Sequence, residues 1–141
     1  MLSGSAGFAL REDGGFAGSL TGGLKMWSRT ALIADLSIMG KDCELVGCTD
    51  DVYSMGVLGI GLRSWLGERW WVRGSVGLGF AELRYSEEAG DADGGLGWTA
   101  GAGFDLYRGP SASLDLRIGL IGVLGEHVGP VRGTFGVGLT L

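Results

Sequence analysis

The sequence predicts an all-β fold in which eight antiparallel strands form one up-and-down barrel. Three observations predict it: two kinds of residue alternate along every long segment, glycine is abundant while proline is rare, and turn residues divide the chain into eight segments. The chain has 141 residues, of which 30 are Gly and 2 are Pro. This length suits a single domain, residues 1–141, and is too short for two ordinary cores.

Alternation with a period of two marks a strand whose two faces differ. Along residues 69–81, the even positions read Trp-Val-Gly-Val-Leu-Phe and the odd ones from 71 read Trp-Arg-Ser-Gly-Gly-Ala. The same alternation runs through residues 96–107, 111–124 and 131–141, and no segment shows a helical period. The expected strands are residues 4–11, 16–27, 30–39, 52–66, 69–85, 95–107, 111–124 and 130–141.

Every second connection between these strands is a tight turn, and the others are longer. An even number of strands with short turns at one end and longer loops at the other is typical of barrels that span a membrane. The longest stretches without a charge have only eleven residues, as in 14–24. Eleven residues are too few for a membrane helix of about 20 residues, but they match a membrane strand of roughly 9–11.

The two strand faces indicate which side meets lipid. One face carries large apolar residues, and the other is mostly Gly, Ser, Thr and Ala with isolated charges. Glycine weakens a strand exposed to water, whereas the inside of an eight-stranded barrel has room only for small or interleaved side chains. The apolar face is therefore expected outside, which makes this a transmembrane β-barrel. A soluble, lipocalin-like ligand-binding barrel with the faces reversed is the alternative.

Aromatic residues gather near both ends of the expected strands, where Trp and Tyr anchor barrels at the membrane–water interface. Ordinary packing at strand ends is the other interpretation. The expected interface residues are Trp27, Trp65, Trp70, Trp71 and Tyr107 at the short-turn end and Trp98 toward the long-loop end.

Charged residues of both signs lie on the expected inner face. Charges inside a membrane protein must pair or meet water, so a mixed network would plug the lumen. A narrow, cation-lined and anion-favouring channel is the alternative. The expected network comprises Lys25, Asp35, Arg63, Arg73, Asp105, Asp115, Arg117 and Arg132, and Arg11 lies on the same face.

Cys43 and Cys48 lie five residues apart in one expected loop. Two cysteines so close predict a disulfide if the chain passes through an oxidising compartment; a reduced pair or a weak metal site is the alternative. His127, the single histidine, lies in another loop with no serine placed to form a hydrolytic site with it. We therefore expect no catalytic residue, no metal, no cofactor and no enzymatic activity.

The long loops are acidic and hold eleven of the sixteen acidic residues against one basic residue, Lys41. The simplest interpretation is a solvated surface whose charges repel one another. Capture of divalent cations, alone or bridged to lipopolysaccharide phosphates, is a second interpretation. The formal net charge of −5 argues against nucleic acid as a partner.

Residues 136–141, Gly-Val-Gly-Leu-Thr-Leu, resemble the Gly-x-x-Φ-x-Φ signal that the outer-membrane assembly machinery reads on a last strand, although such strands usually end in Phe or Trp. With this ending, the whole chain resembles the small bacterial outer-membrane β-barrels, the OmpA-like transmembrane domains and OmpX-like proteins. The resemblance implies a monomer in the outer membrane, with the lipid bilayer, lipopolysaccharide and the assembly machinery as partners. No signal peptide heads the sequence, so a mature form is expected.

That family includes anchors, adhesins, channels and a few enzymes, so the resemblance alone does not decide function. The sequence favours a non-enzymatic structural or surface-interaction protein with acidic extracellular loops and a plugged lumen. The narrow, porin-like channel and the soluble ligand-binding barrel stay as alternatives.

Overall fold

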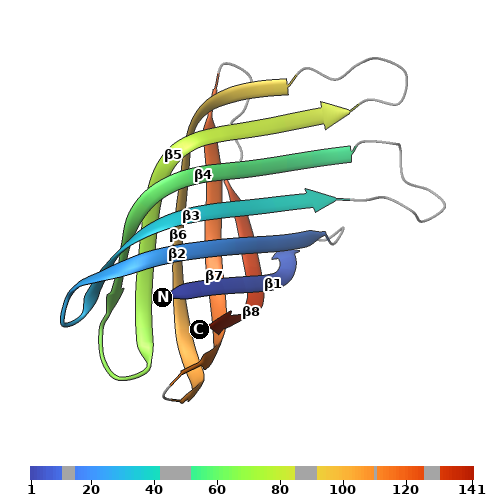
Figure 1. The fold of residues 1–141 in the computed structure, drawn as a ribbon. Coiled ribbons are helices and arrows are strands. Elements are labelled where there is room, and N and C mark those ends of the chain that lie inside the picture. The colour runs from blue at the N-terminus through green and yellow to red at the C-terminus, as the bar shows by residue number, and fades with distance from the viewer. Residues whose placement is uncertain (11–14, 42–51, 85–91, 110, 126–130) are drawn as a thin grey trace.

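The computed structural model describes residues 1–10, 15–41, 52–84, 92–109, 111–125 and 131–141. Eight antiparallel strands follow one another around a closed barrel, and the first pairs with the last (Figure 1). The predicted fold class is thereby confirmed. The strands are β1 (Leu2–Leu10), β2 (Phe16–Trp27), β3 (Thr30–Lys41), β4 (Val52–Trp65), β5 (Trp70–Arg84), β6 (Ala92–Arg108), β7 (Ser113–Leu124) and β8 (Arg132–Thr140).

The observed strand bounds follow the predicted ones closely, and β2 matches at both ends. The largest difference is at β6, which begins at Ala92 because the backbone of this segment pairs with β5 as far as Glu82. The acidic, glycine-containing residues 92–94 are predicted as part of a turn, but their backbone pairs with β5. The described residues contain no helix that could cross a membrane.

Both termini and three tight turns lie at one end of the barrel, here called the turn end (Figure 1). Backbone hydrogen bonds link these turns to neighbouring strands: Trp65 donates to the Arg29 carbonyl at 2.8 Å, and Asp105 donates to the Arg69 carbonyl at 2.9 Å. The opposite end, where β1, β3, β5 and β7 finish, is called the loop end. The chain therefore alternates between short and long connections, as the sequence predicts.

Side-chain exposure alternates along the strands. On β5, Leu78 is 75% exposed and Ser75 only 4%. Large exposed apolar side chains come from all eight strands and surround the barrel. A soluble barrel would bury such side chains, so this distribution favours lipid as the surrounding medium.

An apolar layer, which the sequence does not predict, fills the lumen toward the loop end. There both faces of β4 and β7 are apolar, as in residues 55–58 and 120–124, so the alternation that marks the lumen fades. The inward side chains pack as one buried cluster. The members of this apolar cluster are Met39, Met55, Val57, Ile121 and Val123.

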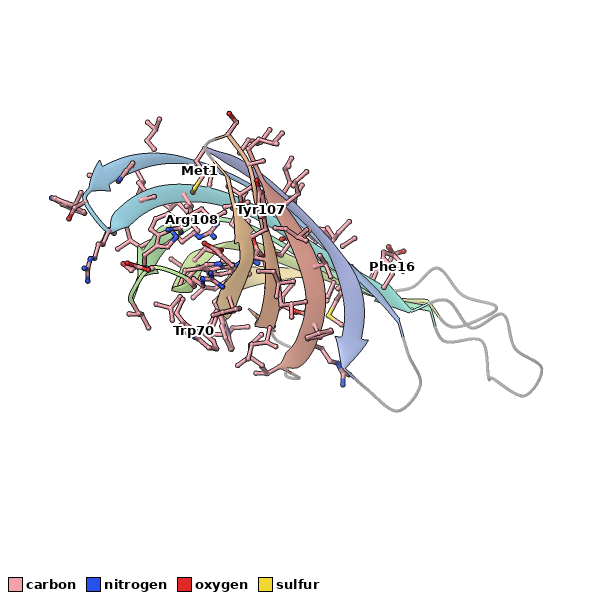
Figure 2. The ribbon with its side chains drawn as sticks, turned by 90° about the horizontal axis from the view of Figure 1, so that it is seen from below. Met1, Phe16, Trp70, Tyr107 and Arg108 are labelled. Atoms are coloured by element: carbon pink, nitrogen blue, oxygen red, sulfur yellow. The ribbon has the colours of Figure 1, made fainter. Side chains whose placement is uncertain are left out.

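The prediction for the aromatic residues is wrong for Trp65 and Trp71. Both lie at inward positions of their strands, and Trp71 is 1% exposed. Their position near the turn end predicts an interface role. Because successive side chains on a strand alternate between its two faces, these odd-numbered residues point into the lumen. Trp27, Trp70 and Tyr107 are exposed at the turn end, and Figure 2 shows Trp70 and Tyr107 there with Phe16 toward the loop end. Trp98 is partly exposed on the outer face.

Candidate functional site

The described residues hold their most extensive polar network in the middle of the lumen, around the buried carboxylate of Asp35. Its Oδ1 accepts hydrogen bonds from Thr21 Oγ1 at 2.8 Å and from Arg73 Nη1 at 3.0 Å. Its Oδ2 accepts from Ser37 Oγ at 3.2 Å and from Thr99 Oγ1 at 3.0 Å. Because the donors come from β2, β3, β5 and β6, one side chain links half of the barrel wall.

Ser75 extends this network. Its Oγ lies 2.7 Å from Thr99 Oγ1 and 3.3 Å from Asp35 Oδ2. Each hydroxyl has a single proton to donate, so the shorter route has Ser75 donate to Thr99 and Thr99 donate to Asp35. The carboxylate is then surrounded by donors, an arrangement suited to holding strands together rather than to proton transfer or metal binding.

A second ion pair lies closer to the turn end, between two inward residues of β7. Arg117 binds Asp115 through two hydrogen bonds, Nε to Oδ1 at 2.7 Å and Nη2 to Oδ2 at 2.8 Å. A side chain at Gly138 on β8 would overlap the Arg117 guanidinium, which would then have to shift. The guanidinium also lies 5.4 Å from the Trp71 ring centroid.

Arg63 is 3% exposed and lies beside two aromatic rings, and among the described residues it forms no salt bridge. Its guanidinium carbon lies 4.1 Å from the Trp71 ring centroid and 4.9 Å from that of Trp65, within the range of cation–π attraction. The buried Asp105 has Arg108 Nη2 at 2.6 Å from Oδ2, but within the described residues neither carboxylate oxygen accepts a well-aligned hydrogen bond.

The deeply placed charges balance in number. The sequence predicts six cations against three anions on this face, but Lys25 is exposed at the turn end and Arg11 lies outside the described residues. Arg132 is half-buried near the loop end and makes contacts of its own. What remains inside is three arginines, Arg63, Arg73 and Arg117, and three aspartates, Asp35, Asp105 and Asp115.

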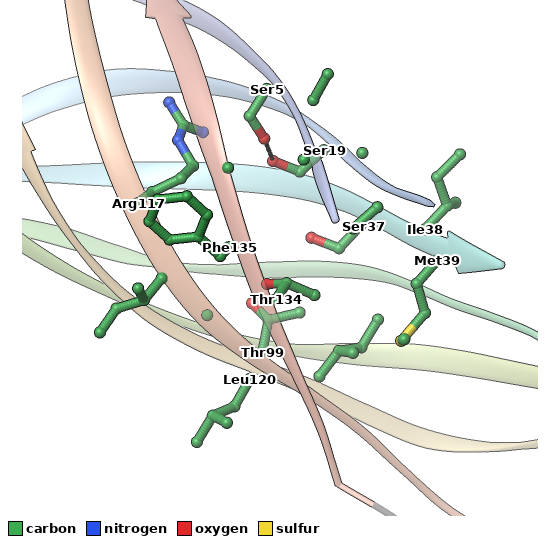
Figure 3. A pocket seen from close by; sticks show the side chains of 18 of the residues that line it. Ser5, Ser19, Ser37, Ile38, Met39, Thr99, Arg117, Leu120, Thr134 and Phe135 are labelled. Carbon is green, nitrogen blue, oxygen red and sulfur yellow. Dashed lines mark hydrogen bonds between the residues drawn. The ribbon is translucent and has the colours of Figure 1, made fainter. Parts of the chain in front are cut away.

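A cavity of about 40 Å³ lies beside this network (Figure 3). Its polar lining includes Ser37, Thr99 and Thr134, together with Ser5 and Ser19, whose hydroxyl oxygens are 2.6 Å apart. This volume holds a few water molecules. On the loop side, Met39 and Ile121 of the apolar cluster border the cavity.

The arrangement of the whole chain has known counterparts among solved structures. Ail of Yersinia pestis, crystallised with the heparin analogue sucrose octasulfate, gives a TM-score of 0.64 at 14% identity over 98% of this chain and 94% of that one. Neisserial surface protein A gives 0.62 at 15% identity, over 98% and 92%. Ail in a phospholipid nanodisc gives 0.60 at 17% identity, over 97% and 96%. The fold is that of the small outer-membrane β-barrels.

No protein-family model matches the sequence, and neither does any curated protein. At identities below one fifth, the likeness extends to the fold and carries no residue roles. The roles of individual residues are therefore inferred from the contacts within this structure alone.

Several predicted features lie outside the described residues, namely Cys43, Cys48, His127 and most of the acidic loop residues. Where the structure describes the chain, no group of three His, Cys, Asp or Glu side chains could hold a metal ion. The sequence predicts the charged members of the lumen network but not its hydroxyl members, Thr21, Ser37, Ser75 and Thr99. Their inward parity near mid-strand was the available signal.

Proposed function

We propose that the protein is a non-enzymatic barrel of the bacterial outer membrane that contacts surface partners through its loop end and has a plugged lumen. One observation carries the proposal: the apolar outer face surrounds an interior filled by the apolar cluster, the Asp35 network and the Arg63–Trp71 stack. The central cavity beside the network has a volume of only about 40 Å³. The filled interior supports a plug, and the outer face supports residence in lipid.

Charge supports the loop end as the contact surface. With the observed strand bounds, the connections at that end carry ten of the sixteen acidic residues. Ail was solved with a sulfated heparin analogue, but acidic loops would repel such a polyanion. The chemistry that fits this chain is a cationic protein surface, or lipopolysaccharide phosphates bridged by divalent cations.

The plug is tested by conductance across a planar bilayer. The native protein is expected to give no steady current. A Met55→Ala/Val57→Ala variant removes part of the apolar cluster, and it is expected to pass small currents because water can then enter the loop side of the lumen. The shift in gel mobility on heating, which marks folded barrels, is measured for both proteins as a control. Stable, anion-selective current from the native barrel would favour the channel alternative instead.

Surface contact is tested with nanodisc-embedded protein on immobilised polylysine and on immobilised heparin. We expect binding to polylysine that falls with salt and that weakens when Glu87, Glu88 and Asp91 are replaced by their amides. A stronger response to heparin, or a polylysine response that the amide variant retains in full, would contradict the proposed role of these loop charges.

A further inference from the structure

A second hollow, of about 700 Å³, opens to solvent at the mouth of the barrel on the turn end. It lies between the three tight turns and the ends of β2, β4, β6 and β8. A volume of this size is within the range of small-ligand pockets, roughly 300–1,000 Å³. The side chains that matter for its chemistry define the turn-side vestibule: Lys25, Arg29, Trp65, Glu68, Arg108 and Thr140.

The side chains of the vestibule are mainly cationic. Lys25, Arg29 and Arg108 face one carboxylate side chain, Glu68. Within the described part of the chain, neither Lys25 nor Arg29 takes part in a salt bridge. Arg108 places one nitrogen on Asp105, and its side chain is 47% exposed, so other N–H groups are free to bind a ligand. A concave cationic surface concentrates anions.

Buried hydrogen-bond donors without a partner form a second, independent observation. Trp65 Nε1 and Thr140 Oγ1, both in the vestibule lining, are buried and have no hydrogen-bond partner among the described residues. Arg63 Nε and Trp71 Nε1, deeper at the same end, are in the same state. Two of these donors belong to residues that line the hollow. Because burial of an unpaired donor costs free energy, they favour a ligand whose acceptors reach them once the covering side chains shift.

We propose that the turn-side vestibule binds a soluble, polyvalent anion of the phosphate class. A phosphate group has several acceptor oxygens and more than one negative charge, so it can accept from guanidinium, ammonium, indole and hydroxyl donors at once. A cation would meet three positive side chains. The vestibule lies within the ring of strands, whereas Trp27 and Trp70 face outward, so the ligand is expected to enter from water rather than from the bilayer.

The test is calorimetric titration of inorganic pyrophosphate into the protein in nanodiscs of zwitterionic lipid. Saturable binding with one site per barrel is expected. The Lys25→Gln/Arg29→Gln variant removes two exposed charges and is expected to weaken binding by about tenfold or more. The matched control is Arg69→Gln, an exposed turn cation outside the vestibule lining, which should keep the affinity within about twofold. Gel mobility verifies that each variant folds.

Two further measurements distinguish a specific site from diffuse electrostatic attraction, and a soluble ligand from a lipid headgroup. Trp65→Phe replaces the indole with a smaller ring that has no N–H, and it should weaken binding without changing the net charge. With anionic phosphatidylglycerol in the discs, an unchanged affinity supports a soluble ligand, whereas competitive loss of binding assigns the vestibule to lipid headgroups and overturns the proposal. No saturation up to about 10 mM pyrophosphate, or equal weakening by Arg69→Gln, overturns it too.

Discussion

At the scale of single residues, glycines and large side chains are matched across neighbouring strands. Gly122 on β7 pairs with Trp98 on β6, and a Cβ at Gly122 would lie within 2.6 Å of the indole. Phe80 lies in the same way over Gly56. A ring that lies flat on the backbone needs a neighbour without a side chain, so this part of the glycine content is a packing requirement.

Gly122→Ala is therefore expected to lower the free energy of unfolding by about 1–3 kcal/mol, because the added methyl group displaces Trp98. Urea unfolding of the protein in lipid vesicles measures the change. Gly74→Ala is the matched control: it is also on the outer face, and only one backbone oxygen lies within 4 Å of its Cβ position. An equal loss at both sites would show that strand propensity, and not the Trp98 contact, explains the effect.

Asp35→Asn tests the central network. The substitution leaves the Arg73 guanidinium buried without its carboxylate, and loss of one member of a buried pair costs about 3–5 kcal/mol. We expect a corresponding fall in the free energy of unfolding. Glu68→Gln removes one negative charge from an exposed turn, so it serves as the control and should change stability little. If the two variants unfold alike, Asp35 does not hold the strands together.

At the scale of elements, the sequence predicts the strands well because one rule, alternation, applies to nearly all of them. Alternation also predicts which face of the sheet a residue occupies, as for Val76 on the outer face and Ser75 in the lumen. Trp65 and Trp71 differ from the prediction because their odd-numbered positions turn them inward, although both lie at the strand end where interface aromatics are expected. Alternation does not predict the apolar cluster, because both faces of β4 and β7 become apolar near the loop end. The contacts of Asp35 could not be predicted, since strand register sets which hydroxyls meet it.

The connection between β3 and β4 carries the predicted disulfide. Cys43 and Cys48 are expected to be joined in protein taken from the cell envelope, and thiol labelling before and after reduction measures this. Because the bridge would close only a short loop, its contribution is about 2–3 kcal/mol at most. Reduction should leave the barrel folded, as judged by gel mobility. Two reactive thiols in native, unreduced protein would contradict the disulfide.

At the scale of the whole molecule, the chain separates its charges along the barrel axis. The loop end carries most of the acidic residues, whereas the turn-side vestibule presents Lys25, Arg29 and Arg108. Between these ends, the lumen balances three arginines with three aspartates, and lipid-compatible side chains surround it. The net charge of −5 is thus distributed unevenly, with an acidic loop end and a cationic turn end. Its two ends are suited to different partners.

The central claim is that the apolar outer face of this barrel meets lipid. Spin labels at positions 76 and 118, in a chain with Cys43 and Cys48 replaced by Ser, report which medium surrounds mid-strand outward residues in vesicles. A label at position 68, on an exposed turn, is the aqueous reference. The structure predicts quenching by lipid-soluble oxygen at 76 and 118 and by aqueous nickel only at 68. Nickel quenching at all three positions would contradict a membrane-embedded barrel.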